Sequence, residues 1–92
     1  MSNKLSEDWS NIRADIYSEE EISASDLRVE IIGEIIKARQ ESNLSQMMLS
    51  KQSGVKQPII ARMESGSSDP RLSTILKVLA PLGKTLKVVS IE

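Results

Sequence analysis

Three side chains of different chemistry stand together in the middle of this 92-residue chain: Lys56, Gln57 and Pro58. An ammonium group donates hydrogen bonds, a carboxamide both donates and accepts them, and proline presents apolar carbons without a backbone donor. An amphipathic stretch with Ile59 and Ile60 follows at once. A helix that only fills a core has no use for such a trio at its start, so these residues predict contact with a partner outside the core.

The residues that most often perform catalysis or bind metal are missing. The chain contains neither cysteine nor histidine, which excludes disulfides, the usual transition-metal ligands, a cysteine nucleophile and a histidine base. Its apolar runs are far shorter than the roughly 20 residues needed to cross a bilayer, and its polar N-terminus lacks a signal-peptide pattern. We therefore expect no enzymatic activity, no metal, no cofactor and no membrane contact, in a soluble cytoplasmic protein.

The two ends of the chain carry opposite charge. Residues 1–35 contain nine acids and three bases, a net charge of -6, whereas residues 36–92 contain nine bases and four acids, a net charge of +5. A basic surface attracts phosphate, and an acidic surface attracts a cationic partner. Two solvated faces would produce the same asymmetry, so charge alone leaves both interpretations open.

Apolar spacing predicts one short and one long helix in the first half. Trp9 and Tyr17, the only aromatic residues, fall in a short amphipathic helix with an apolar edge of its own. Ser18 and Glu21 have the spacing of a capping box, which predicts a helix start. The longest helix then ends near residues 39–42, and its continuity through residues 23–27 stays open. Its 3.6-residue stripe consists of Leu27, Ile31, Ile32, Ile35 and Ile36.

Two short helices joined by a glycine turn follow. Asn43 suits the left-handed end of the long helix, and Ser45 suits the N-cap of the next one. Gly54 can adopt the positive φ that closes this helix before a second one over residues 57–65. The side chains expected to face the core are Met48 and Leu49 in the first helix, Val55 in the turn, and Ile59, Ile60 and Met63 in the second.

A last helix and a strand are predicted at the C-terminal end. Asp69 and Pro70 suit the N-cap and the first position of a helix that ends near residues 81–83. Residues 84–92 are rich in β-branched residues and predict a short strand, whose backbone groups a second copy of the chain could pair. The inward side chains of the helix are expected to be Leu72, Ile75, Leu76, Val78 and Leu79.

Residues 44–66, LSQMMLSKQSGVKQPIIARMESG, resemble the lambda-repressor-like, XRE-type helix-turn-helix. The resemblance extends over roughly residues 30–82 and implies an all-α, five-helix domain that binds DNA. The chain then divides into an acidic helical extension over residues 1–24, the helix-turn-helix domain over residues 25–83, and the C-terminal strand over residues 84–92.

In this family the start of the second short helix enters the major groove. The resemblance therefore implies that Gln57 pairs with adenine, that Lys56 reaches a phosphate or guanine, and that Pro58 touches a thymine methyl group.

Four further residues are implied as DNA contacts. Gln46 would hold a phosphate at the start of the first short helix, and Arg62 would read guanine or hold phosphate. Ser67 and Ser68 would add donors to phosphate. A solvated helix position for Gln46, an internal salt bridge for Arg62 and a simple loop role for the two serines are the alternatives.

One ion pair is implied as structural rather than functional. Arg39 and Glu64 occupy positions that often link the first helix of such domains to the end of the recognition helix. The pair would fix the geometry of the motif without reading sequence, and removing one partner would destabilise the fold if the pair is buried.

The regions on both sides of the first short helix point to one group of proteins within this family. Residues 8–28 and 55–89 resemble HigA-type antitoxins of type II toxin–antitoxin modules, with similarity over nearly the whole chain. This implies a basic, HigB-like mRNA interferase as partner and a homodimer that represses its own operon at an inverted-repeat operator. The candidate toxin-binding surface is the acidic, apolar edge that consists of Trp9, Ile12, Arg13, Ile16, Tyr17, Glu20 and Glu21.

Three alternatives remain at this point. The apolar edge of the N-terminal region could pack on the protein's own core instead of a toxin. The chain could be a stand-alone XRE-type repressor without a toxin partner. It could also be a helical interaction module that never binds DNA, in which case no salt-dependent operator binding is expected.

Overall fold

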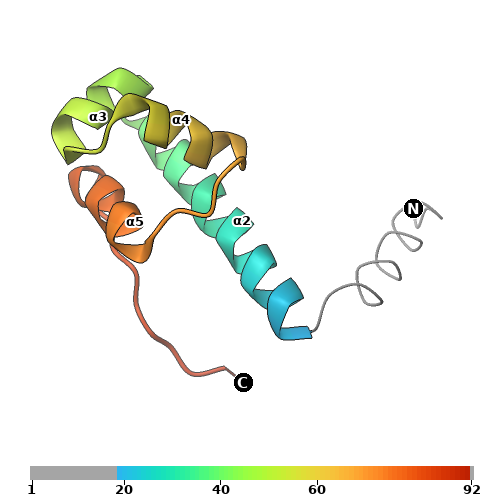
Figure 1. Ribbon diagram of the computed structural model, residues 1–92. Coiled ribbons are helices and arrows are strands. Elements are labelled where there is room, and N and C mark those ends of the chain that lie inside the picture. Colours follow the sequence, from blue (N-terminus) through green and yellow to red (C-terminus); the bar gives the residue numbers. More distant parts are fainter. Residues whose placement is uncertain (1–18, 92) are drawn as a thin grey trace, which may run out of the picture. The chain divides into compact units, whose positions relative to one another are not determined.

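The computed structural model describes the backbone of residues 19–91 and the side chains of residues 23–91 (Figure 1). This part of the chain contains four α-helices rather than the five expected: α2 (Glu19–Glu41), α3 (Gln46–Ser53), α4 (Gln57–Ser65) and α5 (Leu72–Leu79). A 3₁₀ turn, η1 (Ala80–Leu82), follows α5. The all-helical class is confirmed for these residues. The chain divides into two compact units, residues 1–30 and 31–92.

Helix α2 runs unbroken through residues 23–27, where the sequence left its continuity open. The segment contains neither proline nor glycine, so nothing in it interrupts helical hydrogen bonding. In the first unit, Leu27 and Val29 are 56% and 67% exposed. The predicted inclusion of Leu27 in the buried stripe is therefore wrong, and the predicted start at Ser18 lies outside the described residues.

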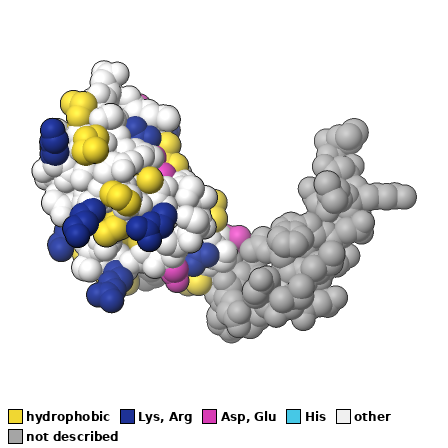
Figure 2. Space-filling view, turned by 45° about the horizontal axis from the view of Figure 1, so that its top comes forward, with side chains coloured by type: hydrophobic (Ala, Val, Ile, Leu, Met, Phe, Trp, Pro, Cys, Tyr) yellow, Lys and Arg dark blue, Asp and Glu magenta, His cyan; other side chains and the backbone are white. Residues whose placement is uncertain are grey.

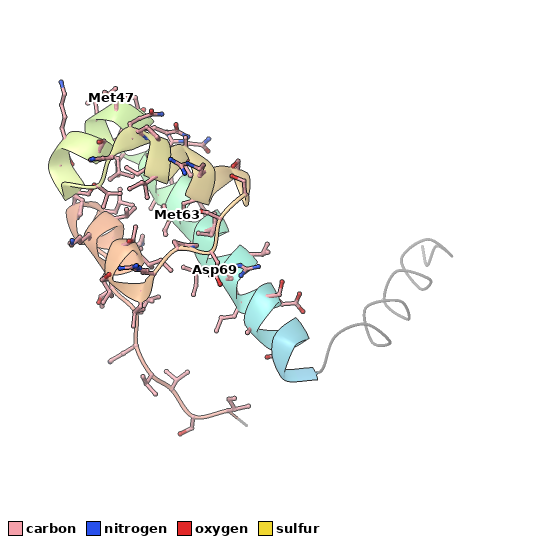
Figure 3. All side chains as sticks on the ribbon, viewed as in Figure 1. Met47, Met63 and Asp69 are labelled. Atoms are coloured by element: carbon pink, nitrogen blue, oxygen red, sulfur yellow. The ribbon has the colours of Figure 1, made fainter. Side chains whose placement is uncertain are left out.

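The second unit has one aliphatic core, built by residues 31–41 of α2 together with α3, α4, α5 and η1. Burying such a side chain completely contributes about 1.5–3 kcal/mol relative to leaving it in water. Figure 3 labels Met63, which points from α4 into this core. The side chains with the least exposure are Ile35, Leu49, Ile60, Met63 and Val78.

Four apolar residues expected to face this core lie at its surface instead. Met48, Ile59, Leu72 and Leu76 are 46%, 40%, 61% and 39% exposed. Successive residues of an α-helix are turned by about 100°, so a helix of eight or nine residues can direct only a narrow stripe toward its neighbours. In α4 that stripe is Ile60 and Met63, three positions apart, and Ile59 is turned away from it.

The helix boundaries follow local chemistry at three places. Asn43 has a φ of 57° after α2, and Gly54 has a φ of 76° after α3, as predicted. The Ser45 hydroxyl accepts a hydrogen bond from the Met48 backbone N–H at 3.1 Å, which confirms the predicted N-cap.

The predicted cap at Asp69 and Pro70 is wrong. Helix α5 begins at Leu72, and its N-cap is Arg71, whose extended backbone (φ −67°, ψ 151°) keeps Pro70 out of the helix. The Arg71 carbonyl accepts the first helical hydrogen bond, from the Ile75 N–H at 3.1 Å.

The predicted C-terminal strand is also wrong, because residues 84–91 form neither helix nor strand. A strand needs a partner for its backbone donors and acceptors, and the described residues contain no other strand with which it could pair. Leu86 still packs against the core, but Val88, Val89 and Ile91 are 101%, 75% and 99% exposed.

Candidate nucleic-acid interface

Helices α3 and α4 and the turn between them form the frame of the candidate site. The Gly54 N–H donates to the Ser50 carbonyl at 2.9 Å, and the Ser53 hydroxyl accepts from the Val55 N–H at 3.2 Å. Val55 itself is 6% exposed, beneath the turn. The turn is therefore closed by hydrogen bonds and anchored in the core, which fixes the direction of α4 relative to α3.

The predicted ion pair between Arg39 and Glu64 is present and has fork geometry. Arg39 donates from Nε to Glu64 Oε2 at 2.7 Å and from Nη2 to Oε1 at 2.8 Å. A third donor, Nη1, bonds the Leu44 carbonyl at 2.8 Å. The two side chains are only 14% and 7% exposed, and hydrogen bonding to Glu64 raises the pKa of the Arg39 guanidinium. The pair thus ties α2 to the end of α4 and to the loop before α3.

The two glutamines predicted as DNA contacts extend this network. Gln46 Nε2 donates to Glu64 Oε1 at 3.0 Å, and Gln57 Nε2 donates to Gln46 Oε1 at 2.9 Å. An ionised carboxylate can only accept, so Glu64 forces the Gln46 amide to donate from nitrogen and to present its oxygen to Gln57. The Glu64 carboxylate thus orients the Gln46 amide, and the Gln46 amide orients that of Gln57.

This orientation leaves Gln57 with a defined free edge. One N–H of its Nε2 is bonded to Gln46, and the second N–H and the carbonyl oxygen Oε1 remain for a ligand. A donor beside an acceptor matches N7 and the N6 amino group of adenine in the major groove. The free edge of Gln57 thus has the donor and the acceptor that the predicted pairing with adenine requires, and Gln46 holds this side chain in place.

Lys56 and Pro58 flank this amide at the start of α4, and both are exposed. Lys56 is the N-cap residue, and its exposed side chain makes no capping hydrogen bond, because an ammonium group has no acceptor. Pro58 lies at the first turn, where a missing backbone donor has no cost.

Arg62 and Ser67 make internal hydrogen bonds in the residues described. Arg62 Nε donates to the Pro58 carbonyl at 3.3 Å, which lays the exposed guanidinium along the outer face of α4 instead of in an ion pair. The Ser67 N–H and hydroxyl both donate to the Arg62 carbonyl, at 3.1 and 3.2 Å. These bonds correspond to the loop role left open for Ser67, whereas Ser68 is an exposed loop residue.

The surface around this site is basic. Figure 2 turns the α3–α4 side toward the viewer and shows Lys and Arg side chains around apolar ones, with little acidic surface between them. Glu64 adds little negative charge to this surface, because the largely buried Glu64 carboxylate is paired with Arg39. The exposed basic residues of the second unit are Lys37, Lys51, Lys56, Arg62, Arg71, Lys77, Lys84 and Lys87.

Two features of the site were not predicted from the sequence. One feature of the sequence could have predicted the hydrogen bond between Gln46 and Gln57: each of these residues begins one of two adjacent helices. No feature of the sequence could have predicted that the Leu44 carbonyl accepts a hydrogen bond from Arg39, because every residue has a backbone carbonyl. The predicted toxin-binding residues Trp9, Ile12, Arg13, Ile16 and Tyr17 lie outside the described residues, and the side chains of Glu20 and Glu21 are not described.

The described residues offer neither a metal centre nor a membrane span. No group of three or more acidic, His or Cys side chains in this part of the chain could hold a metal ion. None of its helices combines the length and the apolar character that crossing a bilayer requires.

Comparisons with known proteins agree with this geometry. Residues 35–89 match the helix-turn-helix family. The chain is 51% identical over 88 residues to an uncharacterized HTH-type transcriptional regulator of Haemophilus influenzae, covering 96% of this chain and 90% of that protein. It is 34% identical over 59 residues to the antitoxin HigA1 of Mycobacterium tuberculosis, covering 64% of this chain and 40% of the antitoxin.

A solved structure of a toxin–antitoxin module from Streptococcus pneumoniae contains a chain that resembles almost all of this one. That chain is 53% identical to this protein, and the two superpose with a TM-score of 0.73. The match covers 99% of this chain and 96% of the S. pneumoniae chain.

Proposed function

Because this chain belongs to the helix-turn-helix family, we propose that it is a HigA-type antitoxin that represses its own operon and neutralises a HigB-like mRNA interferase. The observation that carries the DNA-binding half is the hydrogen-bonded series from Arg39 through Glu64 and Gln46 to Gln57. It holds a base-reading amide in one orientation at the start of α4, on a basic surface. The antitoxin half is supported by the similarity to a toxin–antitoxin module over nearly the whole chain.

The proposed operator is an inverted repeat bound by a homodimer. Two copies of α4 would address half-sites about one DNA turn apart. We propose phosphate contacts for Gln46, Ser67 and Ser68, phosphate or guanine contacts for Lys56 and Arg62, and base contacts for Gln57 and Pro58. Footprinting on DNA upstream of the gene tests this arrangement, and a single asymmetric footprint would contradict the symmetric dimer.

The N-terminal region is proposed to bind the toxin. Residues 1–24 carry most of the acidic excess, and an acidic surface complements a protein basic enough to bind RNA. Binding there would occlude or displace catalytic residues of the toxin without any chemistry by the antitoxin.

Deletion of residues 1–24 is expected to abolish toxin binding in calorimetry and growth rescue on co-expression, while operator binding is retained. The toxin to use is the basic protein encoded by the adjacent reading frame. Unchanged toxin affinity would reject the N-terminal assignment, and failure of the full chain to co-purify with the adjacent product would reject the antitoxin function.

A second candidate function is a stand-alone repressor, favoured by the name of the H. influenzae relative, an HTH-type transcriptional regulator. A stand-alone repressor would bind DNA as the proposed antitoxin does, but its gene would have no adjacent reading frame for a small basic protein. Both functions require operator affinity that falls steeply as salt rises, since bound phosphates release counterions. Salt-independent binding would instead favour an interaction module without DNA.

Gln57→Ala is expected to relax base preference at one operator position by about 1–3 kcal/mol. Gln46→Ala should weaken binding to every sequence, because it removes a phosphate contact, and should also reduce the preference at the Gln57 position, because Gln57 loses its anchor. Fluorescence anisotropy on operators changed at each position measures both effects. Strict additivity in the double variant would show that the hydrogen bond between the two amides has no role in reading DNA.

A further inference from the structure

Ile59 lies outside the buried core and has no role in the proposed site. It is 40% exposed, although its neighbour Ile60 is fully buried. One exposed isoleucine on a protein surface needs no explanation. The position of Ile59 on α4, however, indicates a possible contact with DNA.

The position of Ile59 follows from helix geometry. Pro58, Arg62 and Ser65 are exposed and lie along one side of α4, opposite the buried Ile60 and Met63. With about 100° per residue, Gln57 and Ile59 are about 200° apart and border this outward side on opposite edges. Helical side chains tilt toward the N-terminus, so Ile59 covers the first turn of α4 on the edge away from Gln57.

The other exposed apolar side chains lie elsewhere. Met47, labelled in Figure 3, and Met48 project from α3, and Leu72 and Leu76 from α5. Of the large apolar residues exposed in the part of the chain that the structure describes, Ile59 is the one on the recognition helix.

The major groove offers one apolar group to such a side chain, the C5-methyl group of thymine. We propose that Ile59 is a specificity-determining residue that contacts this methyl group, on the groove wall opposite the base read by Gln57. The inference rests on the proposed DNA-binding function and adds a base to its operator. Each half-site then holds a second thymine that is recognised through its methyl group, besides the one proposed for Pro58.

Substituting deoxyuridine for thymine tests this contact, because it removes the methyl group and leaves base pairing unchanged. The probe is a duplex that the full-length chain selects from a randomised pool, with each thymine of a half-site replaced in turn. Apart from the thymine proposed for Pro58, one replacement should weaken binding by wild type about fourfold, the effect of one buried methyl-sized group. At that position Ile59→Ala should bind the thymine and deoxyuridine duplexes equally, and Ile59→Val should retain part of the difference.

Leu76→Ala is the matched control, since Leu76 is 39% exposed and lies on α5. It should keep the fourfold difference whatever its effect on overall affinity. A selected duplex in which no thymine replacement depends on residue 59 overturns the inference and leaves the repressor function intact. A pool from which the wild-type chain selects no sequence overturns the proposed function itself, and the Ile59 contact with it.

Discussion

Replacing Arg39 with alanine is expected to lower the free energy of unfolding by about 3–5 kcal/mol. Glu64 is only 7% exposed and would keep its charge in a largely buried place, with Gln46 as its remaining hydrogen-bond donor. The Leu44 carbonyl would lose its donor as well. Urea unfolding followed by circular dichroism measures the change.

Lys37→Ala on the same helix is the control, because Lys37 is exposed and its loss should change stability by no more than about 0.5 kcal/mol. Arg39→Lys should recover only part of the loss, since an ammonium group cannot reproduce the two parallel bonds of the guanidinium. If Arg39→Ala behaved like Lys37→Ala, the pair would have the small net effect of a surface salt bridge.

The double variant Arg39→Met, Glu64→Leu separates stability from function. Apolar residues of similar volume often replace a buried ion pair without loss of stability. This variant should therefore fold, yet its Gln46 would have no acceptor at Glu64 and Gln57 would lose its fixed orientation. Reduced base preference in a stable protein would assign the pair a positioning role in DNA reading.

Ile60→Ala is expected to lower the free energy of unfolding by about 2–5 kcal/mol, through lost burial and the cavity it leaves. Ile60 is fully buried in the core of the second unit. Ile59→Ala, the same substitution one residue earlier, should cost about 1 kcal/mol or less, because that side chain is 40% exposed.

Thermal and urea unfolding of both variants check this contrast. Equal losses would mean that α4 packs through a different face from the one described. The same pair also separates stability from recognition, because Ile59→Ala is expected to keep the fold while it loses sensitivity to the thymine methyl group.

Local chemistry in the sequence was sufficient for several features. The left-handed backbone of Asn43, the Ser45 cap and the glycine turn at Gly54 depend on residues next to one another, whose conformational preferences act over a few positions. The ion pair between Arg39 and Glu64 came instead from the family resemblance, because 25 residues separate its partners along the chain.

Tertiary structure alone decided the rest. Apolar type and spacing could not separate Ile60 from Ile59, since burial depends on which side of α4 meets the other helices. Residues 84–92 have strand-like composition, but a strand forms only where a second strand satisfies its backbone. The orientation of Gln57 needed the acceptor-only Glu64, seven residues further along α4, and Gln46 from α3. The sequence by itself thus determined the described helices and, except at the start of α5, the chemistry at the ends that it predicted. The packing of those helices determined which groups face the core and which are oriented toward a partner.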